Sequence, residues 1–136
     1  MVKIEIRYEG GLRCAATHGP SGQTLQTDAP VDNHGRGESF SPTDLVATAL
    51  GTCMATIMGI VAERHSLDLR GMEITVTKEM SAEAPRRIAR LATTIKVPLA
   101  ANHPQRALLE NAALTCPVHK SLSEEMEKPI AFDWVG

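Results

Sequence analysis

Residues 41–65 read SPTDLVATALGTCMATIMGIVAERH, the pattern of one long and largely buried helix. Ser41 is a favoured N-cap residue and Pro42 suits the first helical position. Asp44 completes a capping box in its weaker form, with Asp in place of Glu or Gln. The stretch is apolar almost all round until Glu63, so we expect burial on most sides. A central helix enclosed by a sheet or by a partner subunit fits this pattern.

Three short strands are predicted before this helix. Apolar and charged residues alternate over residues 2–8, a glycine pair marks a turn, and residues 12–17 follow as the hairpin partner. A second turn leads to a third strand at residues 23–28. Residues 29–41 then form a loop of unusual length for a small domain, and loops of this kind tend to be functional.

Further strands and helices are predicted after the central helix, which gives the order β-β-β-α-β-β-α-β. This order is an α+β arrangement without a βαβ nucleotide signature or a glycine-rich phosphate loop, so no cofactor is expected. We expect a single domain over residues 1–136. The expected elements are strands at 71–80 and 87–97, a helix that starts at Pro104 and runs toward Cys116, a further helical turn or two over 118–126, and a final strand at 130–135. In the strand at 87–97, alternation places Leu91, Thr93, Ile95 and Val97 on one face.

Composition excludes several classes of partner. The formal net charge of −2 argues against nucleic acid, because phosphate neutralisation needs a basic surface. We expect no apolar run to approach the roughly 20 residues that span a bilayer, and therefore no membrane partner. The N-terminus alternates apolar and charged residues and lacks a signal-peptide h-region, so we expect a cytoplasmic protein. Aromatic residues make up only 3% of the chain, which favours extra burial in a homo-oligomer.

The three cysteines, Cys14, Cys53 and Cys116, are too few for a secreted disulfide framework. Cys53 lies in ALGTCMAT, and a free cysteine in a helix is most often a small buried hydrophobe. However, Gly51 and Gly59 have no side chains to cover this part of the helix. Each glycine lowers the stability of the helix by about 1 kcal/mol relative to alanine. Small neighbours leave room for a second sulfur or a substrate. Cys14, in a strand, is interpreted as structural filler.

The setting of Cys116 favours a reactive thiol more strongly. Pro117 interrupts the helix beside the sulfur, and His119 and Lys120 bring charge that could lower the pKa of the thiol. His119 either reaches Cys116 across one helical turn or is simply a surface residue. A zinc site would need Cys53, Cys116 and His119, with Cys14 or His34 as the fourth ligand. No CxxC or HxxxH pair supports that alternative, so no metal is expected.

At Phe40-Ser-Pro-Thr-Asp-Leu45 and Ala49-Leu-Gly-Thr-Cys-Met54 the chain resembles the OsmC/Ohr family of thiol-dependent hydroperoxide reductases. The resemblance extends over essentially the full length, through Lys78-Glu-Met80 and Cys116-Pro-Val-His-Lys-Ser-Leu122. It implies two α+β chains intertwined in a homodimer, with the long helices at the centre. It also implies that Cys53 is the peroxidatic thiol and Cys116 the resolving thiol, and that a dithiol reductant, often of the lipoyl type, restores the pair.

The family also uses an arginine, oriented by an acidic residue, to keep the peroxidatic thiol deprotonated. Cys53 lies about three turns into its helix, beyond the reach of the helix dipole. Arg36 is the first candidate for this arginine and Arg13 the second; Asp44 is the first candidate for the acid and Glu38 the second.

One position departs from the family pattern. In the family's peroxidases the residue after the helix-opening proline is typically glutamate, whereas this chain has Thr43. The departure motivates an alternative function, a non-catalytic dimer that binds a small apolar ligand or senses redox state.

Overall fold

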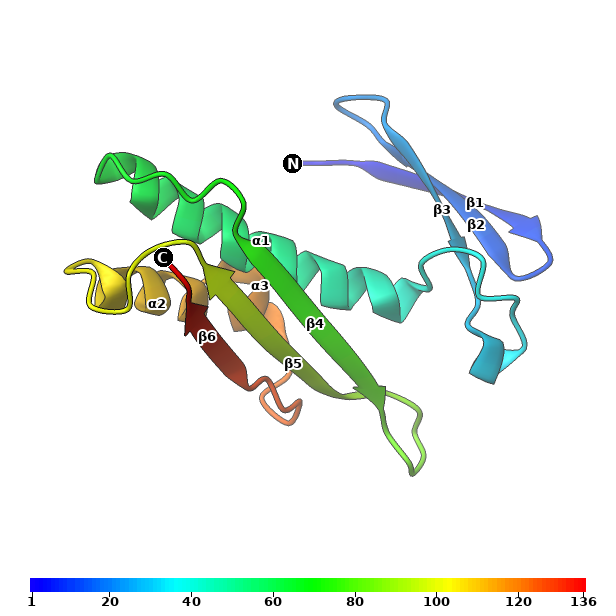
Figure 1. Ribbon diagram of the computed structural model, residues 1–136. Helices are drawn as coiled ribbons and strands as arrows, with labels where there is room; N and C mark the ends of the chain where they lie inside the picture. Colours follow the sequence, from blue (N-terminus) through cyan, green and yellow to red (C-terminus); the bar gives the residue numbers. More distant parts are fainter. The chain divides into compact units, whose positions relative to one another are not determined.

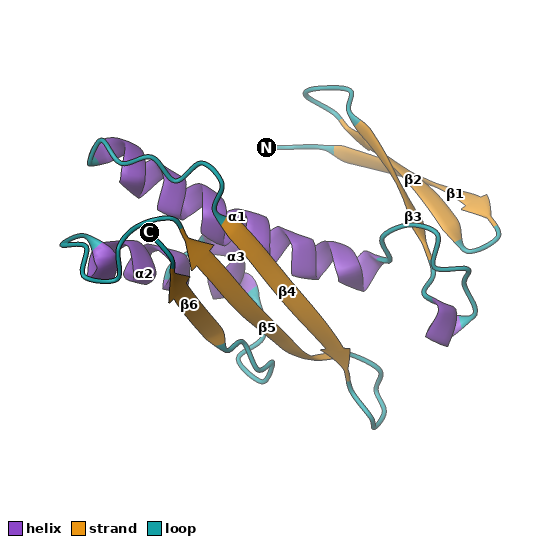
Figure 2. Cartoon of the chain, in the orientation of Figure 1, coloured by secondary structure: helices purple, strands orange, loops and turns teal.

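The secondary structure follows the predicted order in the computed structural model, which describes residues 1–136 (Figure 1). Figure 2 separates the helices from the strands by colour. By its internal contacts the chain divides into two units, Met1–Val46 and Ala47–Gly136. The elements are β1 (Ile4–Gly10), β2 (Arg13–His18), β3 (Thr24–Asp28), a 3-10 turn η1 (Val31–Asn33), α1 (Pro42–Arg64), β4 (Glu73–Met80), β5 (Ile88–Val97), α2 (Arg106–Leu114), α3 (Pro117–Ser121) and β6 (Ile130–Trp134).

The first unit contains an antiparallel sheet in the order β1-β2-β3. Its register places Cys14 opposite Tyr8 on one side and opposite Thr27 on the other. At the open end of the β2–β3 pair, Arg13 lies opposite Asp28. The long loop that follows contains η1, which the sequence pattern did not indicate.

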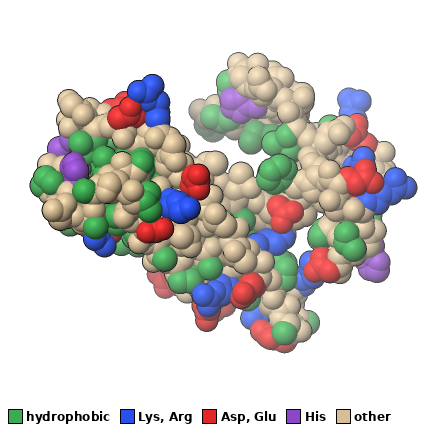
Figure 3. Space-filling model, in the orientation of Figure 1, with side chains coloured by type: hydrophobic (Ala, Val, Ile, Leu, Met, Phe, Trp, Pro, Cys, Tyr) green, Lys and Arg blue, Asp and Glu red, His purple; other side chains and the backbone are tan.

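No hydrophobic residue of the first unit is buried. Its two buried residues, Asp28 and Ser41, are both polar. The alternating apolar residues of β1, among them Ile4 and Ile6, are largely exposed. Figure 3 shows hydrophobic side chains, in green, at the surface among charged ones. This sheet therefore has no hydrophobic core within its own unit.

The second unit contains a three-stranded sheet in the order β4-β5-β6, with α1 and α2 on the same face (Figure 1). β4 and β5 are antiparallel, whereas β5 and β6 are parallel and are connected through α2 and α3. The predicted inner face of β5 is confirmed. Its buried residues alternate along the strand and are Leu91, Thr93, Ile95 and Val97.

The core of this unit lies between the sheet and the two helices. At Gly51 an added Cβ would lie 3.0 Å from Val76 Cγ2 of β4, so glycine permits the close approach of helix to strand. A Cβ added at Gly59 would have no atom within 4 Å, so no other segment of the chain packs closely against the helix at that glycine. The buried hydrophobic residues are Ala47, Leu50, Met54, Met58, Ala62, Leu91, Ile95, Val97, Leu109, Ala112, Ala113 and Cys116.

The expectation that α1 is buried on most sides is wrong for the single chain. Its buried residues follow one stripe, because only the face toward the sheet is covered, and Ile60 on another face is exposed. The statement that no apolar run approaches membrane-spanning length is also wrong. By length and composition α1, with a mean hydropathy of 2.0, could cross a bilayer. One such helix is weak evidence for a membrane span, since the core helix of a soluble protein passes the same test.

Two predicted helix boundaries also differ. Pro104 does not occupy the first position of α2, which begins at Arg106. The reason is a preceding turn, in which the Arg106 N–H donates to the His103 carbonyl and the Gln105 N–H donates to His103 Nδ1. The helical turn after Cys116 ends at Ser121 rather than near residue 126.

Candidate functional site

Cys53 and Cys116 are neighbours in the second unit. Cys53 lies on α1 and is half-buried, between the buried Gly51 and Met54 in the sequence. Cys116 is fully buried at the N-terminal end of α3. The two thiols lie near enough for Cys53 to affect the pKa of Cys116. Both cysteines are free, so the structure corresponds to the reduced pair.

Cys116 is the N-cap residue of α3. Its backbone is extended, Pro117 occupies the first helical turn, and Sγ accepts a hydrogen bond of 3.3 Å from the His119 N–H. The predicted break at Pro117 therefore fixes the sulfur in place instead of freeing it. His119 contributes its backbone amide to this arrangement. Its half-buried ring has no hydrogen-bond partner at Nδ1.

Burial raises the pKa of the Cys116 thiol above its ordinary value. The backbone amides of His119 and Val118 oppose this shift, whereas the nearby Cys53 adds to it. The expectation that neighbouring charge would lower the pKa of Cys116 is therefore wrong. Desolvation outweighs the favourable contacts, because burial disfavours the thiolate.

The raised pKa predicts a loss of stability at alkaline pH. The folded state holds the Cys116 proton more tightly than the unfolded chain does. This stabilisation is therefore complete below the ordinary thiol pKa of about 8.5 and is lost as the pH rises through the folded-state value. Urea unfolding of the reduced protein between about pH 7.5 and 10.5 measures the loss. Cys116→Ala should show a flatter dependence, and equal slopes for the two proteins would contradict the assignment.

Arg36 and Arg13 differ in how firmly they are held. The side chain of Arg36 is 80% exposed, and its Nη1 lies 3.9 Å from Glu38 Oε1. Arg13 Nη2 lies 2.6 Å from Glu38 Oε2 and 3.5 Å from Asp28 Oδ2. The hydrogen bond to Glu38, followed by the charge of Glu38 and that of Asp28, raises the pKa of Arg13. Arg13 is thus the arginine that two carboxylates orient, and its acidic partner is Glu38.

Asp44 completes the capping box that the sequence predicts. Its Oδ2 accepts a hydrogen bond of 2.9 Å from the Ser41 N–H, while its own N–H donates to Ser41 Oγ at 3.1 Å. These reciprocal bonds form the capping box. Ser41 Oγ also lies 3.2 Å from Thr43 Oγ1, so the residue at the departing position joins the same cap.

Two candidates remain, the third cysteine and the alternative zinc site. Cys14 is half-buried within β2. No group of three or more His, Cys, Asp or Glu side chains gathers in a way that could hold a metal ion, so the zinc alternative gains no support.

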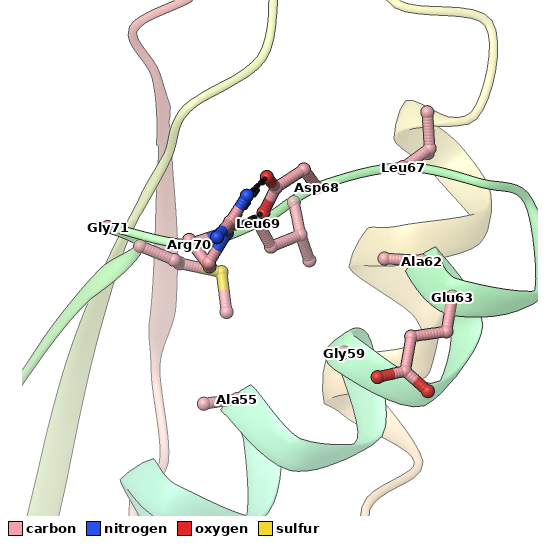
Figure 4. A pocket seen from close by; sticks show the side chains of 10 residues that line it. Ala55, Gly59, Ala62, Glu63, Leu67, Asp68, Leu69, Arg70 and Gly71 are labelled. Atoms are coloured by element: carbon pink, nitrogen blue, oxygen red, sulfur yellow. Dashed lines mark hydrogen bonds and ion pairs between the residues drawn. The ribbon is translucent and has the colours of Figure 1, made fainter.

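A cavity of about 370 Å³ lies between the C-terminal half of α1 and the segment that leads into β4. Figure 4 shows Ala55 and Gly59 on its helical side and the hydrogen-bonded Asp68 and Arg70 on the other. Neither Cys53 nor Cys116 lines it. The cavity is therefore separate from the thiol pair.

Asp28 is the residue of this region that sequence reasoning missed. Its carboxylate is buried beside Arg13, at the end of β3. Counting the hairpin register from the turn at residues 19–23 would have placed it opposite Arg13. An acidic residue at the end of a strand, opposite a candidate catalytic arginine, was the available signal.

Comparisons with known proteins place this arrangement in a family. A model of the family described as OsmC-like protein matches residues 35–128. A crystal structure from Psychrobacter arcticus, provisionally named an osmotic stress induced and detoxification response protein, is 41% identical to this chain. The match covers 97% of this chain and 96% of the other, with a TM-score of 0.91.

More distant structures share the fold. An organic hydroperoxide resistance protein OsmC from Legionella pneumophila is 14% identical over 98% of this chain and 96% of its own, with a TM-score of 0.78. An organic hydroperoxide resistance protein from Elizabethkingia anophelis, with thiocyanate bound, is 12% identical over 99% and 96%, with a TM-score of 0.79. No match was found among curated proteins.

Proposed function

The chain belongs to the OsmC-like protein family, and we propose that it acts as a thiol-dependent reductase of organic hydroperoxides. The observation that carries the proposal is the buried Cys116 thiol, whose pKa the nearby Cys53 helps to raise. Two neighbouring cysteines can form a disulfide where the geometry of their side chains allows it. The names of the Legionella and Elizabethkingia structures agree with this substrate class.

The reaction begins with the Cys53 thiolate, which attacks the distal oxygen of the peroxide. The S–O bond forms as the O–O bond breaks, and the leaving alkoxide takes a proton to become the alcohol. Cys116 sulfur then attacks the Cys53 sulfenic acid, which releases hydroxide that is protonated to water. The product is a Cys53–Cys116 disulfide. An external dithiol, for which a lipoyl-type group is our proposal, reduces it by two exchange steps.

The environment of Cys116 suits the resolving role. Its raised pKa, which burial causes in the first place, keeps Cys116 a neutral thiol near neutral pH until it attacks the sulfenic acid.

For the activating group we propose Arg13 with Glu38, and we retain Arg36 with Asp44 as the competing pair. The short Arg13–Glu38 contact supports the first pair, since an oriented guanidinium loses little freedom when it stabilises a thiolate. The extreme exposure of Arg36 and the capping bonds of Asp44 give the second pair less support. Arg13→Met and Arg36→Met, compared for hydroperoxide turnover, distinguish the two pairs.

A homodimer is part of the proposal. The first unit buries no hydrophobic residue, and α1 buries only one stripe of its side chains. Apolar residues such as Ile6 and Ile60 are therefore exposed in the single chain, and a second chain could cover them. Large contiguous apolar patches on a protein surface often mark protein–protein contacts. Light scattering after size exclusion should give twice the 14.6 kDa chain mass. We also propose that the enzyme works in the cytoplasm, where thiols are kept reduced.

The direct test uses the wild-type protein. With an organic hydroperoxide and dihydrolipoamide, we expect multiple turnovers. Mass spectrometry after one equivalent of peroxide, without reductant, should find a single disulfide that links Cys53 and Cys116. Absence of both turnover and the disulfide would contradict the proposal and favour the alternative, a non-catalytic dimer that binds a small ligand.

A further inference from the structure

His119 is a titratable residue beside Cys116 to which the proposed reaction gives no role. It is half-buried, and its ring atom Nδ1 is enclosed without a hydrogen-bond partner. A polar atom buried in this way costs free energy, because it gives up its hydrogen bonds to water. Stability alone therefore explains this imidazole poorly, whereas a part in the chemistry of the neighbouring thiol would account for it.

The position of His119 in α3 directs its side chain toward Cys116. Cys116 is the N-cap residue and His119 is the third residue of the helix, which is the spacing of a capping box. As in that motif, the side chain of the N-cap residue accepts from the amide of the third residue, here at 3.3 Å from the His119 nitrogen to Sγ. Side chains on a helix lean toward its N-terminus, so we expect the His119 ring to lie beside the sulfur rather than away from it.

The surroundings of His119 favour a neutral ring. Burial lowers the pKa of His119 below its ordinary value, and the charges of Lys128 and Lys120 add to this effect. Lys128 is held in place, because its Nζ donates to the carbonyls of Ser123 and Met126 at 2.6 and 2.9 Å. A neutral imidazole has one nitrogen that can accept a proton, and when Nε2 carries the hydrogen that nitrogen is the enclosed Nδ1.

Cys116 needs a base of this kind. Burial raises the pKa of its thiol, so near neutral pH the thiol carries a proton that must leave as the sulfur attacks. A thiol beside a neutral imidazole is the combination through which a histidine activates a cysteine. The same burial thus creates the need for a base at Cys116 and keeps His119 in the form that can act as one.

We propose that His119 is the proton acceptor for Cys116 in the resolving step. As the Cys116 sulfur forms its bond to the Cys53 sulfur, the thiol proton passes to His119 Nδ1, directly or through one water. The S–O bond of the sulfenic acid breaks, and the imidazolium returns the proton to the departing hydroxide, which leaves as water. The inference rests on the proposed function, because it assigns the base for the second step of that reaction.

The test follows the attack by Cys116 without any peroxide. In a Cys14→Ser protein, the chromogenic disulfide dithiobis-nitrobenzoate should react first with Cys53, because Cys116 is fully buried. That reaction releases one thionitrobenzoate and leaves a mixed disulfide on Cys53. Cys116 then attacks the mixed disulfide and expels a second thionitrobenzoate, while its proton passes to the base. The departing thiolate needs no proton, so the second phase of release isolates the deprotonation of Cys116.

His119→Asn removes the base and keeps the backbone amide that binds the sulfur. At pH 7 we expect the second phase to slow by roughly tenfold to a hundredfold, as for the loss of a general base. The first phase should be unchanged, and the deficit should shrink toward about pH 9, where the thiol ionises unaided. His103→Asn is the matched control with no expected effect, because His103 is also half-buried and its Nδ1 accepts a hydrogen bond from the Gln105 N–H.

Three outcomes would overturn the proposal. These are an unchanged second phase in folded His119→Asn, a deficit of the same size at every pH, which indicates a structural effect, and no second phase in the parent protein. Hydroperoxide turnover is measured separately. A protein with a second phase that depends on His119 but with no turnover would refute the proposed function and leave the assignment of the base intact.

If His119→Asn does not fold, the pH profile of the parent protein decides. With His119 as the base, the rate of the second phase should rise as the imidazole loses its proton and level off above its pKa, which lies below the ordinary value of about 6.5. A rate that rises about tenfold with each pH unit from about pH 6 to 9 would show that the free thiolate reacts without a base, and would overturn the proposal.

Discussion

Replacement of Cys53 by serine is expected to lower the rate of hydroperoxide reduction by roughly a thousandfold or more, as is typical when a catalytic nucleophile is removed. A serine hydroxyl has no accessible anion near neutral pH and cannot form the sulfenic acid. The fold should persist, because Cys53 is only half-buried and serine is smaller. Peroxide consumption with a dithiol reductant measures the effect, and Cys14→Ser, a second half-buried cysteine, is the matched control.

Cys116→Ser should separate the two chemical steps. The first equivalent of peroxide is still consumed, because Cys53 attacks without help from the resolving thiol. Turnover then fails, and the sulfenic acid at Cys53 proceeds to the sulfinic acid with excess peroxide. Mass spectrometry of the Cys53 peptide should show a gain of two oxygens. A Cys116→Ser protein that turns over at the wild-type rate would contradict the assigned division of labour.

Leu50→Ala should give the largest loss of stability among single core substitutions on α1. Leu50 is fully buried, beside Gly51, where the helix lies close to β4. Truncation there removes apolar contacts and leaves a cavity that the closely packed strand cannot fill. We expect a loss of about 2–5 kcal/mol in the free energy of unfolding.

Chemical denaturation at fixed protein concentration measures this loss, since association would otherwise alter the apparent stability. Leu108→Ala provides the control, because Leu108 lies on α2 but is 40% exposed. Its effect should remain well below that of Leu50→Ala. Equal losses for the two variants would show that the α1–β4 contact is not the tightly packed centre of the fold.

The secondary-structure order was predictable because each element carries its own local signal. The cap of α1 is an example: Ser41, Pro42 and Asp44 predict its start, and the hydrogen bonds confirm it. Alternation likewise predicted the inner face of β5. Burial around α1 was not predictable from its composition, because an apolar helix has the same pattern whether one face or all of it is covered within the chain.

The candidate site was only partly predictable for a related reason. Sequence context identified Cys53 and Cys116, but the pKa of Cys116 depends on burial, which outweighs the nearby cations. Arg36 is the first candidate by sequence, whereas the geometry orients Arg13 through two carboxylates. The contact with Asp28 depends on strand register over some fifteen residues, which follows from counting back from the hairpin turn and not from local patterns around each residue.

The coreless sheet of the first unit has a consequence for the order of folding. The strands β1 to β3 bury no hydrophobic residue among themselves. Small isolated sheets of this kind gain too little free energy to stay ordered in water. In the proposed homodimer a second chain would supply the missing apolar surface, and the rate of folding would then depend on chain concentration. Refolding that slows on dilution would be its kinetic signature.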